Sequence, residues 1–136
     1  EVDLQARLWV IPAERMKAGR EHRIPLSDAA VALLRQQEQV LLAGVNLVFP
    51  SVRDHKPLSD MTLTAVLRRM QRNDLTVHGF RSTFRDWAAE ATDYPQEMAE
   101  MALAHVVSNK VEAAYRRGDM LEKRREMMQK WAEFIL

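Results

Sequence analysis

Four groups of polar side chains in the 136-residue sequence could carry out chemistry: Lys17, the pair His78 and Arg81, His105, and Tyr115. His78 and Arg81 lie three residues apart near the expected start of a helix, so they can share one face. A helix start also offers free backbone N–H groups and the positive end of the helix dipole, which suit a phosphate. From spacing alone, a capping histidine and a surface arginine remain the commoner interpretation of this pair.

The other candidates also have ordinary structural interpretations. A single histidine after an apolar helix, such as His105, is more often a hydrogen-bonded structural residue than a catalytic one. A tyrosine on an apolar helix face, such as Tyr115, is usually part of the core with its hydroxyl satisfied. A lysine in a loop, such as Lys17, is usually solvated. Taken one by one, these residues leave both interpretations open.

Several catalytic classes find no support in the residue pattern. The sequence has no cysteine, its four histidines are scattered, and none form an H-x3-H pair, so we expect no metal site. It contains no G-x-S-x-G turn of a serine hydrolase and no glycine-rich phosphate loop. We therefore expect neither a metal ion nor another cofactor.

Basic residues gather locally, although the formal net charge is only +1. Local clusters of this kind can contact phosphates in a protein of near-zero total charge. For any single cluster, a solvated face is the commoner interpretation. The clusters comprise Arg15, Lys17, Arg20, His22 and Arg23, then Arg68, Arg69 and Arg72, and finally Arg116 and Arg117.

The overall composition is that of an ordinary soluble globular domain, with 47% hydrophobic and 29% charged residues. No stretch approaches the roughly 18 consecutive apolar residues of a membrane span, and the acidic N-terminus lacks the apolar region of a signal peptide. Because no cysteine is present for disulfide bonds, we expect a cytoplasmic protein.

The N-terminal part is expected to form a β-hairpin over residues 4–26. Residues 8–12 contain an apolar run that ends at Pro12, and residues 23–26 suit a second, shorter strand. The basic segment between them contains Gly19 and would present Lys17 at the tip of the hairpin.

The remainder, residues 27–136, is expected to be helical apart from a short buried strand at residues 47–50. Ser27 and Ser59 suit helix N-caps, and Pro95 fits the first turn of another helix that ends near residue 103. Further helices are expected at residues 77–91 and 119–134. Asn109 and Glu112 have capping-box spacing, which predicts a short helix carrying Tyr115.

Apolar residues recur at helical spacing and predict which helix faces are buried. We therefore expect one domain that is mainly α with a small antiparallel β-hairpin or sheet. The predicted stripes comprise Ala30, Leu33, Leu34 and Leu41; Leu63, Val66, Leu67 and Met70; Phe80, Phe84, Trp87, Ala88 and Ala91; and Met127, Met128, Trp131 and Ile135.

Taken in order, these residues resemble the tyrosine recombinase (phage integrase) family, in particular its branch from prophages and genomic islands. Residues 9–17 and 23–27 resemble the family's hairpin, which has a catalytic lysine followed by an I/V-P-L-S strand. Residues 77–83 resemble its H-x-x-R box, and residues 103–105 its L-G-H box, with Ala104 in place of glycine. Residues 113–117 resemble the segment around the nucleophile, and residues 122–131 the final helix. The resemblance covers nearly the whole chain.

One motif of the family finds no match. The family has two catalytic arginines, the first in a T-G-x-R-x-x-E context upstream of the hairpin, and nothing before Trp9 resembles it. Arg7 precedes a strand and does not qualify. We therefore expect residues 1–136 to be part of a catalytic domain, with its upstream helices and the DNA-binding domains outside this sequence.

The resemblance implies that Tyr115 attacks a DNA phosphodiester, forms a 3′-phosphotyrosine and releases a 5′-hydroxyl. His78 would accept the tyrosine's proton, and Lys17 would protonate the leaving oxygen. Arg81 and His105 would donate hydrogen bonds to the non-bridging oxygens of the phosphate. No cofactor is implied, because the covalent intermediate retains the bond energy.

The partners implied by the resemblance are double-stranded DNA at attachment sites, other integrase protomers and accessory DNA-bending proteins, with no membrane. The expected phosphate contacts come first from Arg15, Arg20, Arg23, Arg116 and Arg117.

Two alternatives use the same fold without catalysis. One is a DNA-binding or regulatory module. The other is an assembly module whose final helix docks on a neighbouring protomer, although packing of that helix within its own chain is the simpler expectation.

Overall fold

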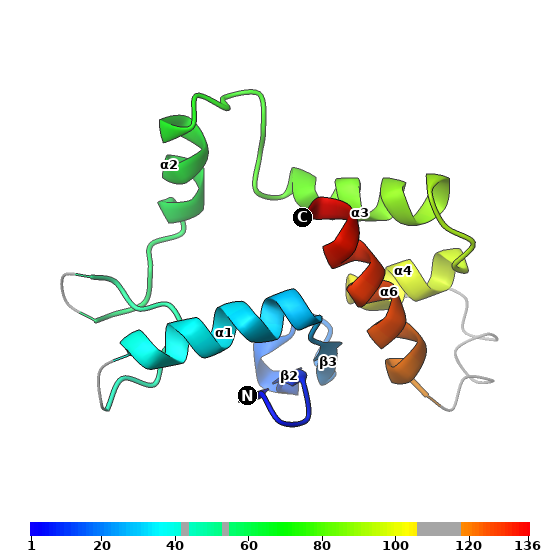
Figure 1. The fold of residues 1–136 in the computed structure, drawn as a ribbon, viewed down its shortest axis with the longest axis horizontal. Helices are drawn as coiled ribbons and strands as arrows, with labels where there is room; N and C mark the ends of the chain where they lie inside the picture. The colour runs from blue at the N-terminus through cyan, green and yellow to red at the C-terminus, as the bar shows by residue number, and fades with distance from the viewer. Residues whose placement is uncertain (42–43, 53–54, 106–117) are drawn as a thin grey trace.

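The computed structural model of the chain describes residues 1–41, 44–52, 55–105 and 118–136. Within them, the predicted fold class is confirmed, because helices accompany one small antiparallel sheet (Figure 1). The strands are β1 (Val2–Asp3), β2 (Leu8–Ile11) and β3 (His22–Pro25). The helices are α1 (Asp28–Val40), α2 (Thr62–Arg69), α3 (Gly79–Glu90), α4 (Gln96–Ala102) and α6 (Leu121–Ile135).

The expected hairpin is formed by β2 and β3, which pair antiparallel with Trp9 opposite Ile24. Strand β2 ends at Ile11 because Pro12 has no N–H to continue the ladder. A 3-10 turn at Ala13–Arg15 begins the connection to β3. The sequence did not predict β1, which adds a third strand at the edge of the sheet.

The predicted cap of the first helix is confirmed. The hydroxyl oxygen of Ser27 accepts a hydrogen bond of 3.3 Å from the backbone N–H of Ala30. Helix α1 then packs on α6, where the side-chain oxygen of Gln129 accepts a 2.9 Å bond from the backbone N–H of Asp28. The start of α1 is thereby tied to the C-terminal helix.

The strand predicted at residues 47–50 is wrong. The described part of that region makes only an isolated bridge between Pro50 and Pro57, and prolines cannot extend a ladder. Helix α2 begins at Thr62, two residues after the position expected from a cap at Ser59. Figure 1 shows α2 set apart from the other helices. Leu67 is buried, but the predicted core residues Leu63 and Met70 are exposed.

The core lies between α3, α4 and α6, with Met127 of α6 fully buried at its centre. Trp131 meets Phe84 edge-on, with ring centroids 5.3 Å apart, and lies 5.1 Å from Trp87. The buried members of this cluster are Phe84, Trp87, Ala88, Met98, Ala99 and Met127.

Several positions of the predicted apolar stripes are wrong. Phe80, in the first turn of α3, is 51% exposed, and Ile135, in the last turn of α6, is 56% exposed. Ala91, just after α3, and Leu33 of α1 are exposed as well. Helical spacing identifies the face that packs but not how far along the helix the neighbouring elements reach.

The short helix expected to carry Tyr115 lies outside the described residues. Among the described helices, none has both the length and the apolar character that crossing a membrane requires.

Candidate active site

The turn that begins α3 is capped by Thr76, not by a histidine. The hydroxyl oxygen of Thr76 accepts a 3.0 Å hydrogen bond from the N–H of Gly79. A side chain at position 79 would meet that hydroxyl at 3.0 Å, so glycine permits the close approach. His78 occupies the N-cap position but makes no capping bond through its exposed side chain. The interpretation of His78 as a capping histidine therefore loses its basis.

The C-terminal end of α4 turns sharply and brings His105 back onto the helix. Ala104 has a left-handed backbone with φ of 55°. The N–H of Ala104 bonds to the carbonyl of Met101, and the N–H of His105 bonds to the carbonyl of Glu100 over 2.9 Å. This pair of bonds is the Schellman motif, which usually has glycine at the left-handed position.

Arg81 of α3 reaches the same turn. Its Nη2 donates a 2.6 Å hydrogen bond to the carbonyl of Leu103, two residues before His105. The structure thus brings Arg81 and the His105 segment together, and His78 lies one helical turn from Arg81, whose N–H bonds to the His78 carbonyl. Three of the five predicted catalytic residues therefore belong to one region, where α3 meets the end of α4.

The carboxylate of Glu100 connects α4 to α3 and to His105. The Oε1 atom of Glu100 accepts a 2.5 Å bond from Nε of Arg85, and its Oε2 lies 2.5 Å from Nδ1 of His105. Burial raises the pKa of the Glu100 carboxyl, but the hydrogen bonds with His105 and Arg85 outweigh it, so the pKa lies below its usual value.

The hairpin is held against the same turn through His22, the first residue of β3. This half-buried imidazole has the backbone of Ala102 as its hydrogen-bond partner and faces Arg81 and Arg124. Burial and then the charge of Arg124 lower the pKa of His22 below its usual value, which favours a neutral ring. Lys17 lies five residues earlier, exposed on the loop that leads into β3.

Glu100 and His22 were not predicted as members of the site. Glu100 pairs with Arg85 across two helices, and His22 meets α4 from a strand, so neither contact follows from spacing along the chain. The unusual Ala104 in the L-G-H box was the only local signal of a special turn beside His105.

The predicted nucleophile Tyr115 lies outside the described residues, as do Arg116 and Arg117. The described chain stops at His105 and resumes at Gly118. The following residue, Asp119, is anchored, because its carboxylate accepts bonds from Nε and Nη2 of Arg23 at 2.8 and 2.7 Å. Arg124 donates to the same carboxylate at 3.0 Å.

A protein-family comparison decides the family. The model described as "Phage integrase family" matches residues 1–122. The chain belongs to the phage integrase family. The predicted resemblance is therefore confirmed, and the described helices and sheet are part of that family's catalytic fold.

Curated members of the family align with almost all of this chain. It is 42% identical to the prophage integrase IntA of Escherichia coli K12 over 99% of its length. It is 37% identical to the prophage integrase IntZ of the same strain over 98%, and 34% identical to the integrase of Enterobacteria phage P4 over 99%. The chain spans about a third of the length of these relatives. No solved structure matches it significantly.

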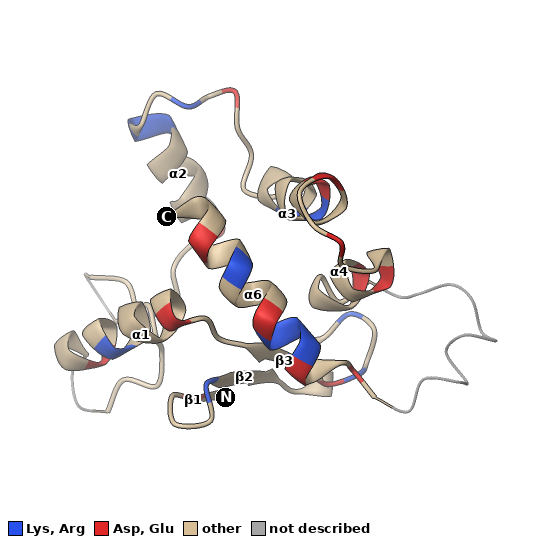
Figure 2. Ribbon diagram, turned by 45° about the vertical axis from the view of Figure 1, so that its right-hand side comes forward, with Lys and Arg blue, Asp and Glu red and all other residues tan. Residues whose placement is uncertain are grey.

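The residues predicted to bind DNA differ in whether they form ion pairs with carboxylates of the same chain. Arg23 is committed to Asp119 through two bonds, and Nη1 of Arg15 contacts both carboxylate oxygens of Glu1 at 2.5 Å. Arg20 is exposed on the loop between β2 and β3. Figure 2 shows basic segments on this loop and on the first turns of α6. Of the predicted phosphate contacts that the structure describes, Arg15 and Arg23 are thus paired with carboxylates of this chain, and Arg20 is exposed.

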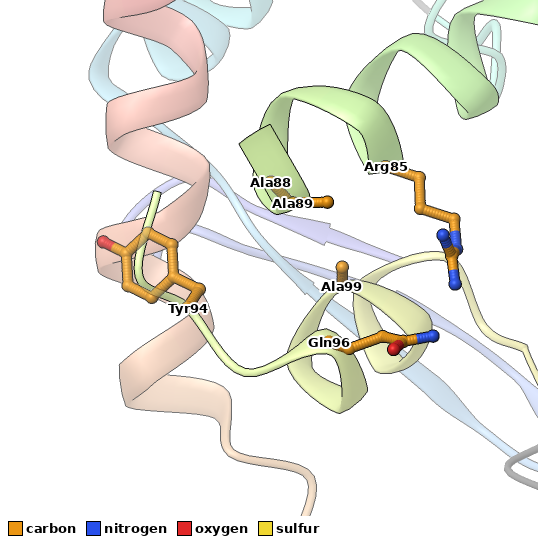
Figure 3. A pocket seen from close by; sticks show the side chains of 6 residues that line it. All are labelled: Arg85, Ala88, Ala89, Tyr94, Gln96 and Ala99. Carbon is orange, nitrogen blue, oxygen red and sulfur yellow. The ribbon is translucent and has the colours of Figure 1, made fainter. Parts of the chain in front are cut away.

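A pocket of about 240 Å³ lies between α3 and α4 (Figure 3). Its wall is largely alanine, from Ala88, Ala89 and Ala99, and Arg85 at its edge is already bonded to Glu100. Tyr94 closes the other side, with its hydroxyl buried. The pocket therefore does not coincide with the predicted integrase residues.

No group of three or more potential metal-binding side chains occurs in the parts of this chain that the structure describes.

Proposed function

We propose that this chain supplies catalytic residues to a site-specific recombinase that cleaves and rejoins DNA through a 3′-phosphotyrosine at Tyr115. The observation that carries the proposal is the contact between α3 and the end of α4. There the bond from Arg81 to the Leu103 carbonyl places two predicted phosphate ligands, Arg81 and His105, at one turn.

The charges at this turn suit a phosphate. The guanidinium of Arg81 has five N–H donors in a plane, and the Leu103 carbonyl uses one of them. The others remain for two non-bridging oxygens, and His105 donates a further bond. By comparison with oxyanion donors in other enzymes, loss of one such contact lowers the rate about 10²–10³-fold.

In the proposed reaction, the hydroxyl oxygen of Tyr115 attacks phosphorus while the bond from phosphorus to the 5′-oxygen breaks. His78 takes the tyrosine's proton, and Lys17 gives a proton to the 5′-oxygen, which leaves as a hydroxyl. Attack by a 5′-hydroxyl of another strand reverses these steps and rejoins the DNA. The exposed positions of His78 and Lys17 are consistent with access to a large substrate.

The partners of this function are double-stranded attachment-site DNA, further integrase protomers and accessory DNA-bending proteins, all in the bacterial cytoplasm. The family's first catalytic arginine belongs to a helix that precedes the hairpin, and no residue before Trp9 matches its motif. We therefore expect the chain alone to bind DNA in a salt-sensitive way but not to cleave it.

A covalent-trapping experiment tests the proposal. The complete protein that contains this chain is incubated with a nicked duplex spanning a junction of its mobile element, and adducts resistant to SDS are counted. The complete protein should form the adduct, whereas Tyr115→Phe and the isolated chain should not. DNA binding without an adduct from the complete protein would favour a non-catalytic DNA-binding module. An adduct that persists in Tyr115→Phe would assign the nucleophile to another residue.

A further inference from the structure

The carboxylate of Glu100 is held on both of its oxygens by groups from different parts of the chain. Arg85 of α3 donates to Oε1, and His105 beyond the end of α4 contacts Oε2, each over 2.5 Å. The side chain of Glu100 is only 19% exposed, whereas that of His105 is 45% exposed. The acidic group is thus mostly covered, whereas nearly half of the surface of the imidazole side chain is exposed.

This contact determines which ring nitrogen of His105 carries a proton. An ionised carboxylate only accepts hydrogen bonds, so the Nδ1 atom that faces it must carry a proton. A carboxylate or carbonyl that fixes one nitrogen of a histidine also determines what the other nitrogen offers. In this chain the nitrogen that remains is Nε2.

We propose that Glu100 is a positioning residue, which fixes His105 with Nδ1 protonated and directs Nε2 outward as the group that meets the DNA phosphate. The proposal rests on the proposed function for the identity of the phosphate. The hold of Glu100 on the ring rests on the described contacts alone.

A chemical consequence follows for His105. With Nδ1–H committed to Glu100, a neutral ring has only a lone pair at Nε2 and would repel a phosphate oxygen. Nε2 donates only when the ring carries both protons, and Glu100 then balances the positive charge. The bond to phosphate is therefore charge-assisted, a stronger class of hydrogen bond than one between neutral groups.

Arg85 fixes the carboxylate itself. It lies four residues after Arg81, so the two arginines emerge from the same face of α3 on successive turns. Arg81 bonds to the Leu103 carbonyl and Arg85 to Glu100, so one helix orients both proposed phosphate ligands. The competing explanation is that Glu100 only joins two helices, without controlling the state of the ring.

Nitrogen NMR on the ¹⁵N-histidine-labelled chain separates these explanations. Two-bond ¹H–¹⁵N spectra identify which ring nitrogen of His105 carries the proton in the neutral form. The unmodified chain should show the Nδ1–H form. In Glu100→Gln, the amide oxygen stays with Arg85 and the NH₂ group faces Nδ1, so the ring should change to the Nε2–H form. An Nε2–H ring in the unmodified chain would overturn the proposal, as would an unchanged ring in folded Glu100→Gln.

Two further variants control for packing and charge. Arg85→Gln removes the bond between the helices but keeps the Glu100 contact, so the ring should remain Nδ1–H. Glu90→Gln removes an exposed carboxylate from the end of α3 and should change nothing at His105. If His105 changes to the Nε2–H form in Arg85→Gln as well as in Glu100→Gln, Glu100 only joins the two helices and does not control the protonation of the ring.

A DNA experiment separates this inference from the proposed function. In the complete protein, Glu100→Gln should slow adduct formation about tenfold, because a neutral bond replaces a charge-assisted one. His105→Gln should slow it more. If the ring forms are as expected but both variants cleave normally, the role of His105 in the proposed function fails while the hold of Glu100 on the ring stands. If the ring forms differ, the positioning proposal fails whatever the cleavage rates.

Discussion

The guanidinium of Arg124 donates a 2.8 Å hydrogen bond from Nη1 to the backbone carbonyl of Arg23, which joins α6 to β3. The Arg124 side chain is 2% exposed and also donates from Nε to the Asp119 carbonyl over 2.7 Å. Burial lowers the pKa of Arg124 below its ordinary value, and the Asp119 carboxylate opposes that effect. A buried cation is tolerated here because each of its nitrogens has an acceptor.

Arg124→Met should therefore lower the free energy of unfolding by about 3 kcal/mol, because it leaves buried acceptors without donors. The loss lies at the lower end of the range for broken buried pairs, since Asp119 keeps its bonds with Arg23 and is partly exposed. Urea unfolding measures the change. Lys123→Met on the exposed face of the same helix is the control and should stay within about 0.5 kcal/mol. Equal effects of the two substitutions would contradict a structural role for Arg124.

The stability of the chain should fall as the pH drops below 6.5, the ordinary pKa of histidine, because folding lowers the pKa of His22. The unfolded chain then binds a proton that the folded chain resists. This contribution is fully present above pH 6.5 and is lost as the pH falls through the lowered pKa. The charged groups facing the ring are Arg124, Asp119 and Arg81.

His22→Gln should reduce the acid sensitivity in this window, as urea midpoints measured across it will test. Glu100 and Asp119, whose carboxyl pKa values are lowered, lose their contributions only at more acidic pH, below their usual values of 4.5 and 3.8. His55→Gln, at an exposed loop histidine, is the matched control and should retain the pH dependence of the unmodified chain. The same slope in all three proteins would show that His22 is not the responsible group.

Ala104→Gly should stabilise the chain by up to about 1 kcal/mol. Alanine at φ of 55° is strained by its Cβ, and glycine removes the strain at some cost in chain entropy. Thermal or urea unfolding measures the gain. Ala89→Gly, on an exposed position within α3, should have the opposite sign and destabilise by about 1 kcal/mol. A loss of stability from both glycines would refute the left-handed geometry at residue 104.

DNA binding should separate Arg20 from Arg23. Arg20→Gln is expected to lower the slope of log affinity against log salt concentration by about 1, because one phosphate contact is lost. Arg23→Gln should instead lower stability by about 1 kcal/mol, because its partner is Asp119 on a partly exposed surface. Anisotropy titrations with a labelled duplex measure the slope. A slope change in Arg23→Gln alone would reverse the assignment.

Local signals in the sequence were enough for elements whose causes lie within a few residues. The cap at Ser27, the end of β2 before Pro12 and the hairpin itself were all correct. Phe80 and Ile135 were wrong because their exposure depends on where neighbouring helices end. The short edge strand β1 has too few residues to show an alternating pattern.

For the candidate site, too, the sequence predicted the motif residues but not the contacts between distant segments. The order of Lys17, His78, Arg81, His105 and Tyr115 indicated the family, which the match to residues 1–122 confirms. Their catalytic roles stay predictions. The contacts around them, from Arg85 to Glu100 and from His22 to α4, join segments that only the folded chain brings together.

The bond from Arg81 to the Leu103 carbonyl restricts a long side chain before any ligand arrives. Much of the rotamer freedom of Arg81 is lost on folding, so under the proposed function less would remain to be lost when a phosphate binds. The same bond limits substitution. A lysine has a single ammonium group, which cannot reach the carbonyl and grip two phosphate oxygens together. At this position the shape of the guanidinium matters as much as its charge.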